Sequence, residues 1–485
     1  MAQLLTLSRA ARLMGMTRGV LQKRIRDGDL PSHDGMVSTE DLLIAFPGAH
    51  LADDAIFERI TRIKEEAFGR RVRERMLPER EILAERLYEQ SLELADVRSH
   101  LQRYHSLVVA LQTRLREVHT APSGTAERAI EELDSWIENE LRRILAETTV
   151  PDSLALMDDM LKLVSAHVIV QPSRRDFFVE GAETILEAAL RAGLSLNYGC
   201  SVGNCGLCKA RVVSGQVKKV RHHDYVLSEA ERLQGHALMC CHTAVSDVVI
   251  EALEAAAPGD IPQQQITARV KSVTPLSEDV CLLHLQTPRT SRLRFLAGQG
   301  VTLGLAGAGE SELYIASCPC DDRNVQFHVV RDAQSAFAER VFAGLDAGEN
   351  VTIWGPWGDL VLREDSLRSL VFVAGDEGFA PLKSLIEHAM ALDTAEALRI
   401  YWHASRPGGH YLANLCRAWS EAFDNVRYAA LAGDVGEFAQ RIMAECAELK
   451  DCDVYLAGSQ PFVDQVGERL RAGSLPARRI AAIAV

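Results

Sequence analysis

The chain has 485 residues, which is too long for one hydrophobic core and predicts three or more domains. Its composition, 47% hydrophobic and 25% charged, excludes wholesale disorder, and its net charge of −14 argues against a surface that binds nucleic acid throughout. No run of 18 apolar residues occurs, and Arg9 and Arg12 interrupt the apolar N-terminal stretch, so we expect neither a membrane span nor a signal peptide but a cytoplasmic protein.

Residues 1–50 predict a small helical domain. One helix is expected over residues 7–15 with Ser8 as its N-cap, and a second from Thr17 to a C-cap at Gly28. The order resembles the winged helix-turn-helix of MerR-type regulators and excisionases, whose second helix enters the major groove of DNA. The resemblance implies that Arg18, Lys23, Arg24 and Arg26 would face DNA. A domain kept for docking or for dimer contacts would carry the same pattern.

Residues 51–165 predict a helical, coiled-coil region. Pro78 can open a long helix, in which apolar residues recur at spacings of four and three, interrupted only by Gln90. The seam consists of Leu83, Leu87, Leu94, Val97, Leu101, Tyr104, Val108, Leu111, Leu115 and Val118. Residues 120–124 end this helix, and a second amphipathic helix follows over 130–144. The two helices could pair within one chain, but we favour a homodimer formed through the coiled coil.

The cysteines give the sharpest signal for chemistry. There are eleven, none before Cys200, and an odd number without an export signal does not indicate a disulfide framework. Cys200, Cys205 and Cys208 form a C-x4-C-x2-C array, and Cys240 follows 32 residues later. This is the ligand spacing of a plant-type [2Fe–2S] cluster, whereas zinc sites usually use two short C-x2-C pairs. These four cysteines are therefore our predicted metal ligands.

Cys240 and Cys241 compete for the fourth position. The segment around them resembles the G-x-x-L-x-C-Q sequence of the ferredoxin domains attached to flavin reductases, and Gly235, Leu238 and Cys240 match it. The resemblance assigns Cys240 as the ligand and leaves Cys241 as a buried neighbour. It implies an α+β ferredoxin domain of the β-grasp type over residues 166–257.

Residues 264–485 carry further motifs in a familiar order. FLAGQGV, LYIASCP, WGPWGDL, VFVAGDEGFAP and VYLAGSQP resemble the flavin and nucleotide motifs of the ferredoxin-NADP reductase superfamily. The resemblance implies an FAD-binding β-barrel at 264–363 and an NAD(P)-binding α/β domain at 364–485, as in reductase components of dioxygenases and soluble monooxygenases. It also implies the cofactor-binding residues Gln299, Tyr314, Ser317, Ser335, Gly375, Gly378, Pro381 and Gly458.

The sequence departs from these motifs at positions that matter for the cofactors. Ser311 and Leu313 replace the flavin-binding arginine and tyrosine, and Gly300 replaces a second tyrosine. We expect Tyr314 to supply an aromatic face instead. Asp376-Glu377 stands where Gly-Thr is usual, and two carboxylates repel a diphosphate.

Cys318 and Cys320 form a C-x-C pair that is compatible with a redox function or with chance.

Two hypotheses explain this multidomain organisation, and we favour the first. The first hypothesis is an NAD(P)H-dependent iron–sulfur flavoprotein reductase, which passes electrons from NADH or NADPH through FAD to a [2Fe–2S] cluster and on to a partner protein such as an oxygenase. No side chain is assigned as catalytic. The alternative is a redox-sensing, DNA-binding dimer that retains a degenerate reductase body. A third possibility treats the first 150 residues as an assembly module.

Overall fold

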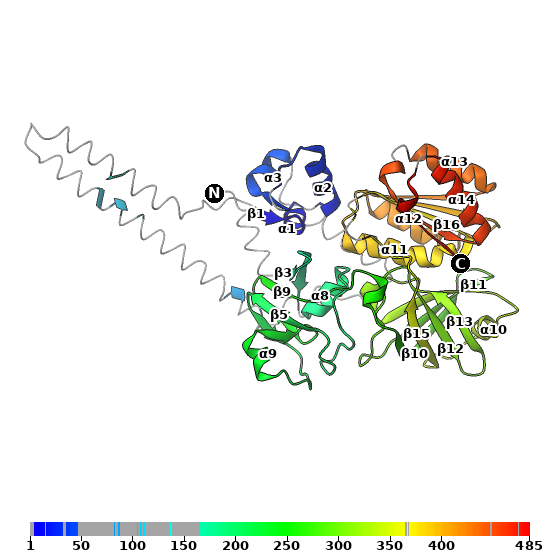
Figure 1. Ribbon diagram of the computed structural model, residues 1–485, viewed down its shortest axis with the longest axis horizontal. Helices are drawn as coiled ribbons and strands as arrows, with labels where there is room; N and C mark the ends of the chain where they lie inside the picture. Colours follow the sequence, from blue (N-terminus) through cyan, green and yellow to red (C-terminus); the bar gives the residue numbers. More distant parts are fainter. Residues whose placement is uncertain are drawn as a thin grey trace, which may run out of the picture.

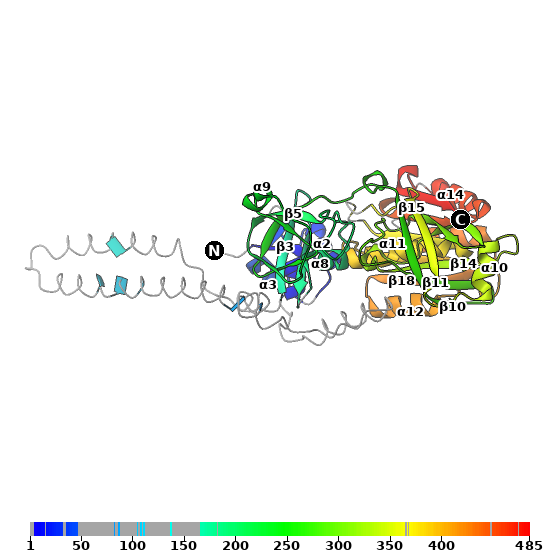
Figure 2. The same ribbon diagram turned by 90° about the horizontal axis from the view of Figure 1, so that it is seen from below.

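The computed structural model describes residues 4–14, 16–32, 35–46 and 165–485, with gaps at 182, 364–365, 367, 447–448 and 474, and isolated positions between 82 and 137. Four folded units follow one another along the chain and are seen from two directions in Figures 1 and 2. Apart from those isolated positions, the predicted coiled coil and its dimer seam lie outside the described residues. Among the described helices, none is long and apolar enough to cross a membrane.

The N-terminal unit is a small helical domain with one short ribbon. Its elements are β1 (Leu4–Thr6), α1 (Leu7–Leu13), α2 (Arg18–Asp27), β2 (Met36–Ser38) and α3 (Thr39–Ala45), and β1 pairs antiparallel with β2. α2 begins after Thr17 and ends at Gly28, whose φ of 83° is left-handed, as predicted. The predicted cap of α1 is wrong, because Thr6 caps this helix while the Ser8 hydroxyl donates to Asp176 in the next domain.

The second unit is a ferredoxin-like β-grasp domain. A five-stranded sheet in the order β4-β3-β9-β5-β7 packs against α8, whose start is fixed by a capping box between Thr184 and Glu187. Its elements are β3 (Ser165–Gln171), β4 (Asp176–Glu180), α8 (Ile185–Arg191), β5 (Lys209–Ser214), β6 (Val217–Lys219), α9 (Glu229–Leu233), β7 (His236–Leu238), β8 (His242–Ala244) and β9 (Val248–Glu251).

The third unit is a six-stranded antiparallel barrel in the order β13-β12-β15-β10-β11-β14. Buried and exposed residues alternate along β10, as expected for a strand with one face on a core. A bridge between Ile315 and Phe327 joins the two edges of the sheet. The elements are β10 (Gln264–Pro275), β11 (Val280–Gln286), β12 (Gly300–Leu305), β13 (Gly309–Tyr314), the 3-10 turn η2 (Pro319–Asp321), β14 (Asn324–Val330), α10 (Ala336–Ala343) and β15 (Asn350–Trp357).

The fourth unit is a parallel α/β domain with the strand order β18-β17-β16-β19-β20. β16 is buried along its whole length, as the central strand of a sheet with both faces covered must be. The chain winds from β16 to one edge and then returns to β19, so the direction changes between these two strands. The elements are β16 (Leu370–Gly375), η3 (Asp376–Gly378), α11 (Phe379–Leu392), β17 (Leu398–Ala404), α12 (Ala413–Ala422), β18 (Val426–Ala432), α13 (Val435–Glu445), β19 (Asp453–Gly458), α14 (Gln460–Ala472) and β20 (Ile480–Ala484).

Candidate functional site

The predicted cluster loop runs from Gly199 to Cys208, between α8 and β5 of the ferredoxin domain. Gly203 and Gly206 have φ values of 78° and 75°, which disfavour any residue with a Cβ. A Cβ at Gly203 would also lie 2.4 Å from the Cβ of His223. The glycines therefore allow the loop to turn tightly under the segment around His223.

The four predicted ligands lie in this loop and at the end of β7, as two pairs. Cys200 and Cys205 interact through their side chains, and Cys208 Sγ lies 3.1 Å from Cys240 Sγ. Three of these side chains are buried, and Cys205 is exposed. Within the described residues, no three His, Cys, Asp or Glu side chains are already arranged around a metal ion. The ligand set thus stays a prediction, supported by the presence of all four thiols in the cluster loop and just after β7 of the ferredoxin domain.

Backbone amides point at the cluster loop sulfurs. Burial would raise the pKa of the Cys200 thiol, but hydrogen bonds from the amides of Val202, Cys205 and Asn204 lower it below its ordinary value. Donors of this kind stabilise thiolate, which is the form that ligates metal, and they fit the inward-facing amides expected around an iron–sulfur centre.

Cys240 and Cys241 take different positions. Cys240 lines a cavity of about 520 Å³ between the ferredoxin domain and the barrel, together with Ser201 and Val202 of the cluster loop. The Cys241 sulfur lies 3.5 Å from that of Cys240 and points toward the carbonyl oxygen of His222, 3.8 Å away. Both thiols are buried, and the sulfur of Cys240 lies beside that of Cys208, while the choice of Cys240 as the ligand stays a prediction.

The cluster loop is bonded directly to the barrel. The Ser201 amide donates to the carbonyl oxygen of Arg289 at 3.0 Å, and the Arg292 amide donates to that of Gly199 at 2.9 Å. The guanidinium of Arg292 also donates to the Ser201 hydroxyl, and that of Arg294 donates to Asn197 at 2.7 Å. The barrel therefore holds the predicted cluster ligands against itself through both backbone and side chains.

Three predicted flavin residues are engaged within the protein. Gln299 is buried, accepts from the Leu296 amide at 2.8 Å and donates to the carbonyl oxygen of Gly358. The Ser317 hydroxyl accepts from the Gln326 amide, and the Ser335 hydroxyl caps α10 by accepting from the Ala338 amide. Their observed role is to shape the barrel.

Tyr314 belongs to an aromatic wall that the sequence motifs did not reveal. Gly300 in β12 is paired with Tyr314 of β13 on one side and with Trp357 of β15 on the other. Because Gly300 has no side chain, the Trp357 ring lies over it and meets the Tyr314 ring edge-on, with 5.0 Å between centroids. The Trp357 Nε1 is buried, and no described residue accepts its hydrogen. Trp357 thus fills the place of the missing tyrosine and leaves a donor available for a ligand.

The predicted nucleotide residues gather at the carboxyl edge of the parallel sheet. Gly375 ends β16 and Gly458 ends β19, the two strands on either side of the change in winding direction. A Cβ at Gly378 would lie 2.3 Å from the carbonyl oxygen of Ala457, so the backbones meet there only because glycine is present. Pro381 lies in the first turn of α11. Ligands of open α/β sheets bind at such an edge.

Asp376 and Glu377 are less repulsive to a diphosphate than the sequence suggested. The Asp376 carboxylate accepts from the amide and hydroxyl of Ser405 at 2.8 and 3.0 Å. Glu377 forms an ion pair with Arg406 at 2.6 Å. Both carboxylates are turned toward the loop after β17, and a cation accompanies one of them.

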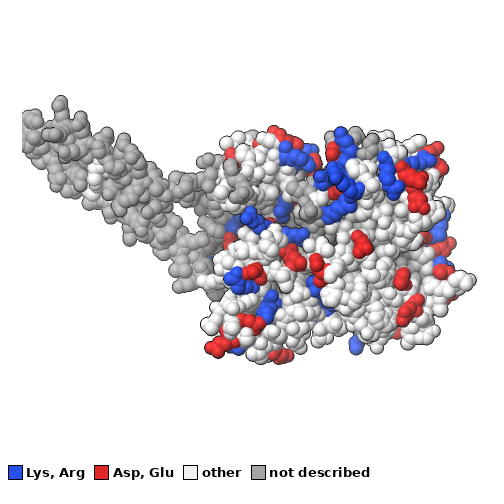
Figure 3. All heavy atoms as spheres, in the orientation of Figure 1, with Lys and Arg blue, Asp and Glu red and all other residues white. Residues whose placement is uncertain are grey.

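The four basic residues predicted to face DNA are in ion pairs within the chain. Arg18 reaches Asp176 of the ferredoxin domain at 3.5 Å, Lys23 and Arg26 both pair with Glu396 of the nucleotide domain, and Arg24 pairs with Asp29. Figure 3 shows basic side chains gathered where α2 meets the nucleotide domain. Three of the four basic residues thus pair with the reductase body, while Arg24 pairs within its own domain.

Asp176 is the centre of this docking contact. Its carboxylate accepts from Thr6 and Ser8 and lies 2.8 Å from His167 Nε2. Burial would raise the pKa of Asp176, but the hydrogen bond from His167 and the charges of His167 and Arg18 hold it below the ordinary value. A carboxyl with a lowered pKa stabilises the docked state fully above about pH 4, and this contribution is lost as pH falls through the lowered pKa.

Replacing Asp176 by alanine is expected to weaken docking of the N-terminal domain by about 1.5–3 kcal/mol, because a charged acceptor of several hydrogen bonds disappears. Hydrogen exchange of residues 4–46 at pH 7 should accelerate. Glu251→Ala, which removes an exposed carboxylate paired with Arg211, is the control and should change nothing there. Equal exchange in both variants would contradict the docking role.

Comparisons with known proteins add the following. A model for a 2Fe–2S iron–sulfur cluster binding domain matches residues 168–245. A CDP-6-deoxy-L-threo-D-glycero-4-hexulose-3-dehydrase reductase from Yersinia pestis is 30% identical over 309 residues, covering 62% of this chain and 92% of that protein. The reductase component of propane 2-monooxygenase from Rhodococcus jostii is 28% identical over 315 residues, covering 61% of this chain and 85% of that protein. A ferredoxin NADP+ reductase structure from Neisseria gonorrhoeae with bound FAD and NADP matches 45% of this chain and 98% of its own, at 16% identity and a TM-score of 0.40.

Proposed function

Because this chain belongs to the iron–sulfur reductases that join a [2Fe–2S] ferredoxin domain to a ferredoxin-NADP reductase-like body, we propose that it passes electrons from NADH or NADPH through FAD to its cluster and on to a partner protein. The acceptor is an oxygenase, as the name of the propane 2-monooxygenase reductase suggests, or a dehydrase of the kind served by the Yersinia reductase.

The observation that carries the proposal is the bonding of the cluster loop to the barrel. Ser201 and Gly199, on either side of Cys200, exchange backbone hydrogen bonds with residues 289 and 292 of the barrel. A protein that transfers electrons between two centres must hold them close and in fixed geometry. These backbone hydrogen bonds would keep the predicted cluster ligands close to the barrel in a fixed geometry, without depending on flexible side chains.

Residues of this chain account for binding of each cofactor. The four cysteines would hold the [2Fe–2S] centre, Tyr314 and Trp357 would pack against the flavin ring, and the edge formed by Gly375, Gly378 and Gly458 would receive the nicotinamide nucleotide. Bound FAD supplies the exchange between the electron pair of a hydride and the single electrons that a cluster carries. The protein's contribution is to hold and orient these groups.

The proposal is tested with the full chain purified anaerobically. Flavin is extracted and identified, and absorbance is recorded before and after addition of NADH or NADPH. Bleaching of both the flavin and the cluster bands is expected. A cluster without flavin, or bands that neither nucleotide bleaches, would refute the proposed reductase activity.

A pair of tryptophan variants tests the flavin wall. Trp357→Ala is expected to weaken FAD binding by about 2- to 12-fold, corresponding to the ~0.5–1.5 kcal/mol of an aromatic pair. Trp354→Ala is the matched control, because this ring also belongs to β15 but lies over Gly304, further along β12 and away from the Gly300–Tyr314 pair. Dissociation constants measured by flavin fluorescence should separate the two variants. Equal losses would indicate general damage to the barrel.

The DNA-binding alternative finds no support, because each basic side chain that it requires is already paired within the chain. The homodimer through residues 83–118 stays a prediction, and light scattering of the full chain would test it.

A further inference from the structure

Cys318 and Cys320 form a disulfide, with 5.2 Å between their Cα atoms, and none of the other nine cysteines, all in the described part of the chain, belongs to a disulfide. The pair lies at the end of the flavin motif LYIASCP, which includes Cys318, and Cys320 belongs to the turn η2. A disulfide that closes so short a loop removes little entropy from the unfolded chain, so it contributes little to stability. Its position points to a different role.

The disulfide lies where three domains meet. The turn η2 packs against α8 of the ferredoxin domain and against α11 of the nucleotide domain. Cys320 is partly exposed and lines the 520 Å³ cavity that Cys240, Ser201 and Val202 also line. Cys318 is buried. Cys320 therefore borders the same cavity as a predicted cluster ligand, while Cys318 is buried.

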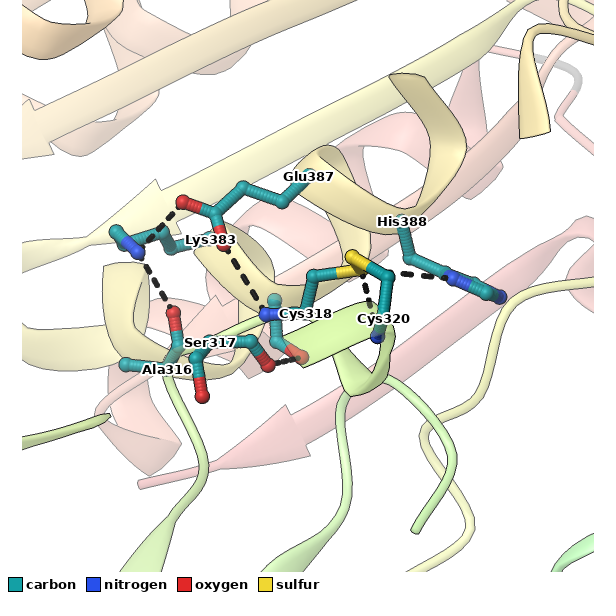
Figure 4. The surroundings of a disulfide bond; sticks show 8 residues. Ala316, Ser317, Cys318, Cys320, Lys383, Glu387 and His388 are labelled. Carbon is teal, nitrogen blue, oxygen red and sulfur yellow. Dashed lines mark hydrogen bonds and ion pairs between the residues drawn. A yellow bond between two sulfur atoms is a disulfide. The ribbon is translucent and has the colours of Figure 1, made fainter. Parts of the chain in front are cut away.

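The buried sulfur lies beside a histidine. His388 Nδ1 of α11 lies 3.8 Å from Cys318 Sγ, and Glu387 accepts a hydrogen bond from the Cys318 amide at 3.1 Å. Figure 4 shows His388 reaching from α11 toward the Cys318 sulfur, while Glu387 of the same helix lies beside Lys383 and reaches the Cys318 amide. When the bond opens, the Cys318 thiolate can take a proton from the imidazole, and the Cys320 thiolate can take one from solvent in the cavity.

We propose that the Cys318–Cys320 disulfide is a redox-active site, reduced by electrons that arrive by way of the [2Fe–2S] centre. Two electrons, delivered one at a time, break the S–S bond, and two protons convert the sulfurs into two thiols. Each electron is lost by a reduced cluster. This inference rests on the proposed function for the cluster, and it adds a two-electron store beside a one-electron carrier.

The test uses the full chain with its cluster, purified without thiols and kept anaerobic. Photoreduced deazaflavin supplies electrons in measured steps, and absorbance and electron paramagnetic resonance follow the cluster. Samples are quenched in acid, alkylated with iodoacetamide and mapped by peptide mass spectrometry. Alkylation should appear at both Cys318 and Cys320 once the cluster is reduced. Ferricyanide should then restore the disulfide.

Variants sharpen the result. The Cys318→Ser/Cys320→Ser chain should take up two electrons fewer than the wild type, while Cys281→Ser, which removes a buried free thiol in the same barrel, should take up the same number. In a cluster-free Cys240→Ser chain the same reductant should leave the pair oxidised. A disulfide that persists beside a fully reduced cluster, or an electron count equal in the double variant and wild type, would overturn the proposal.

Failure of the proposed function gives a different pattern. Cluster bands that respond to deazaflavin but not to NADH or NADPH remove the nicotinamide reductase activity, while the disulfide is still tested because electrons enter the cluster directly. Absence of cluster bands overturns both proposals.

Discussion

Cys240→Ser is expected to yield protein without its [2Fe–2S] centre, whereas Cys241→Ser is expected to retain it. Cys240 Sγ lies 3.1 Å from Cys208 Sγ and faces the cavity beside the cluster loop, while Cys241 is directed at the carbonyl oxygen of His222. Mutation of a residue that only hydrogen-bonds to a metal ligand lowers metal affinity by ~10–100-fold, so loss of a ligand itself should lower it by at least as much.

Iron and sulfide analysis and the paramagnetic signal of the dithionite-reduced protein measure this difference. The two variants are matched, because both remove one buried thiol from adjacent positions. A cluster that survives in Cys240→Ser and disappears in Cys241→Ser would reverse the assignment. Loss in both would mean that the second thiol is also required, for example to keep the loop packed near Gly203.

Lys383→Met is expected to destabilise the nucleotide domain by about 3–5 kcal/mol at pH 8, because it leaves a buried carboxylate without its cation. Lys383 Nζ lies 2.6 Å from Glu387 Oε1 and donates to the carbonyl oxygen of Ala316 at 2.9 Å. The two side chains are 5% and 8% exposed, so water cannot replace the lost partner. The double variant Lys383→Met/Glu387→Gln should recover much of the loss.

The loss should depend on pH. Burial raises the pKa of Glu387, and the charge of Lys383 lowers it in part. Without Lys383, the carboxyl should take up a proton more readily in the folded state. A raised carboxyl pKa makes the destabilisation largest above that pKa and smaller as pH falls through it. Calorimetric melting at pH 8 and pH 5.5 measures the change, and an equal loss at both values would contradict the buried carboxylate as its cause.

Some of the site could be predicted because its signals are local. Cys200, Cys205 and Cys208 lie within nine residues, and one loop must carry them whatever surrounds it. Gly375 and Gly458 each end a strand of a recognisable motif, so their place at one sheet edge followed from the resemblance. The cluster-binding domain is confirmed by the family model over residues 168–245.

Other features depended on residues far apart in the chain. In the sequence, Gly300 suggested that an aromatic ring for the flavin was missing. In the structure, β12 and β15 pair, and the ring of Trp357, 57 positions later in the chain, lies over Gly300. Asp376 and Glu377 looked repulsive because the sequence could not reveal that Ser405 and Arg406 meet them across the sheet edge. The C-x-C pair was ambiguous because nothing local places it beside the cavity of Cys240.

The order of the domains, the cysteine spacing and the turns that need glycine could be predicted from the amino-acid sequence, since spacing and backbone conformation are properties of short segments. The positions of the charges and aromatic rings became known only from the folded chain. Arg18, Lys23 and Arg26 look alike in the sequence whether they face DNA or a neighbouring domain, and docking on Asp176 and Glu396 distinguished the two. A charge or ring takes its role from its partner, and partners from distant segments meet only in the folded chain.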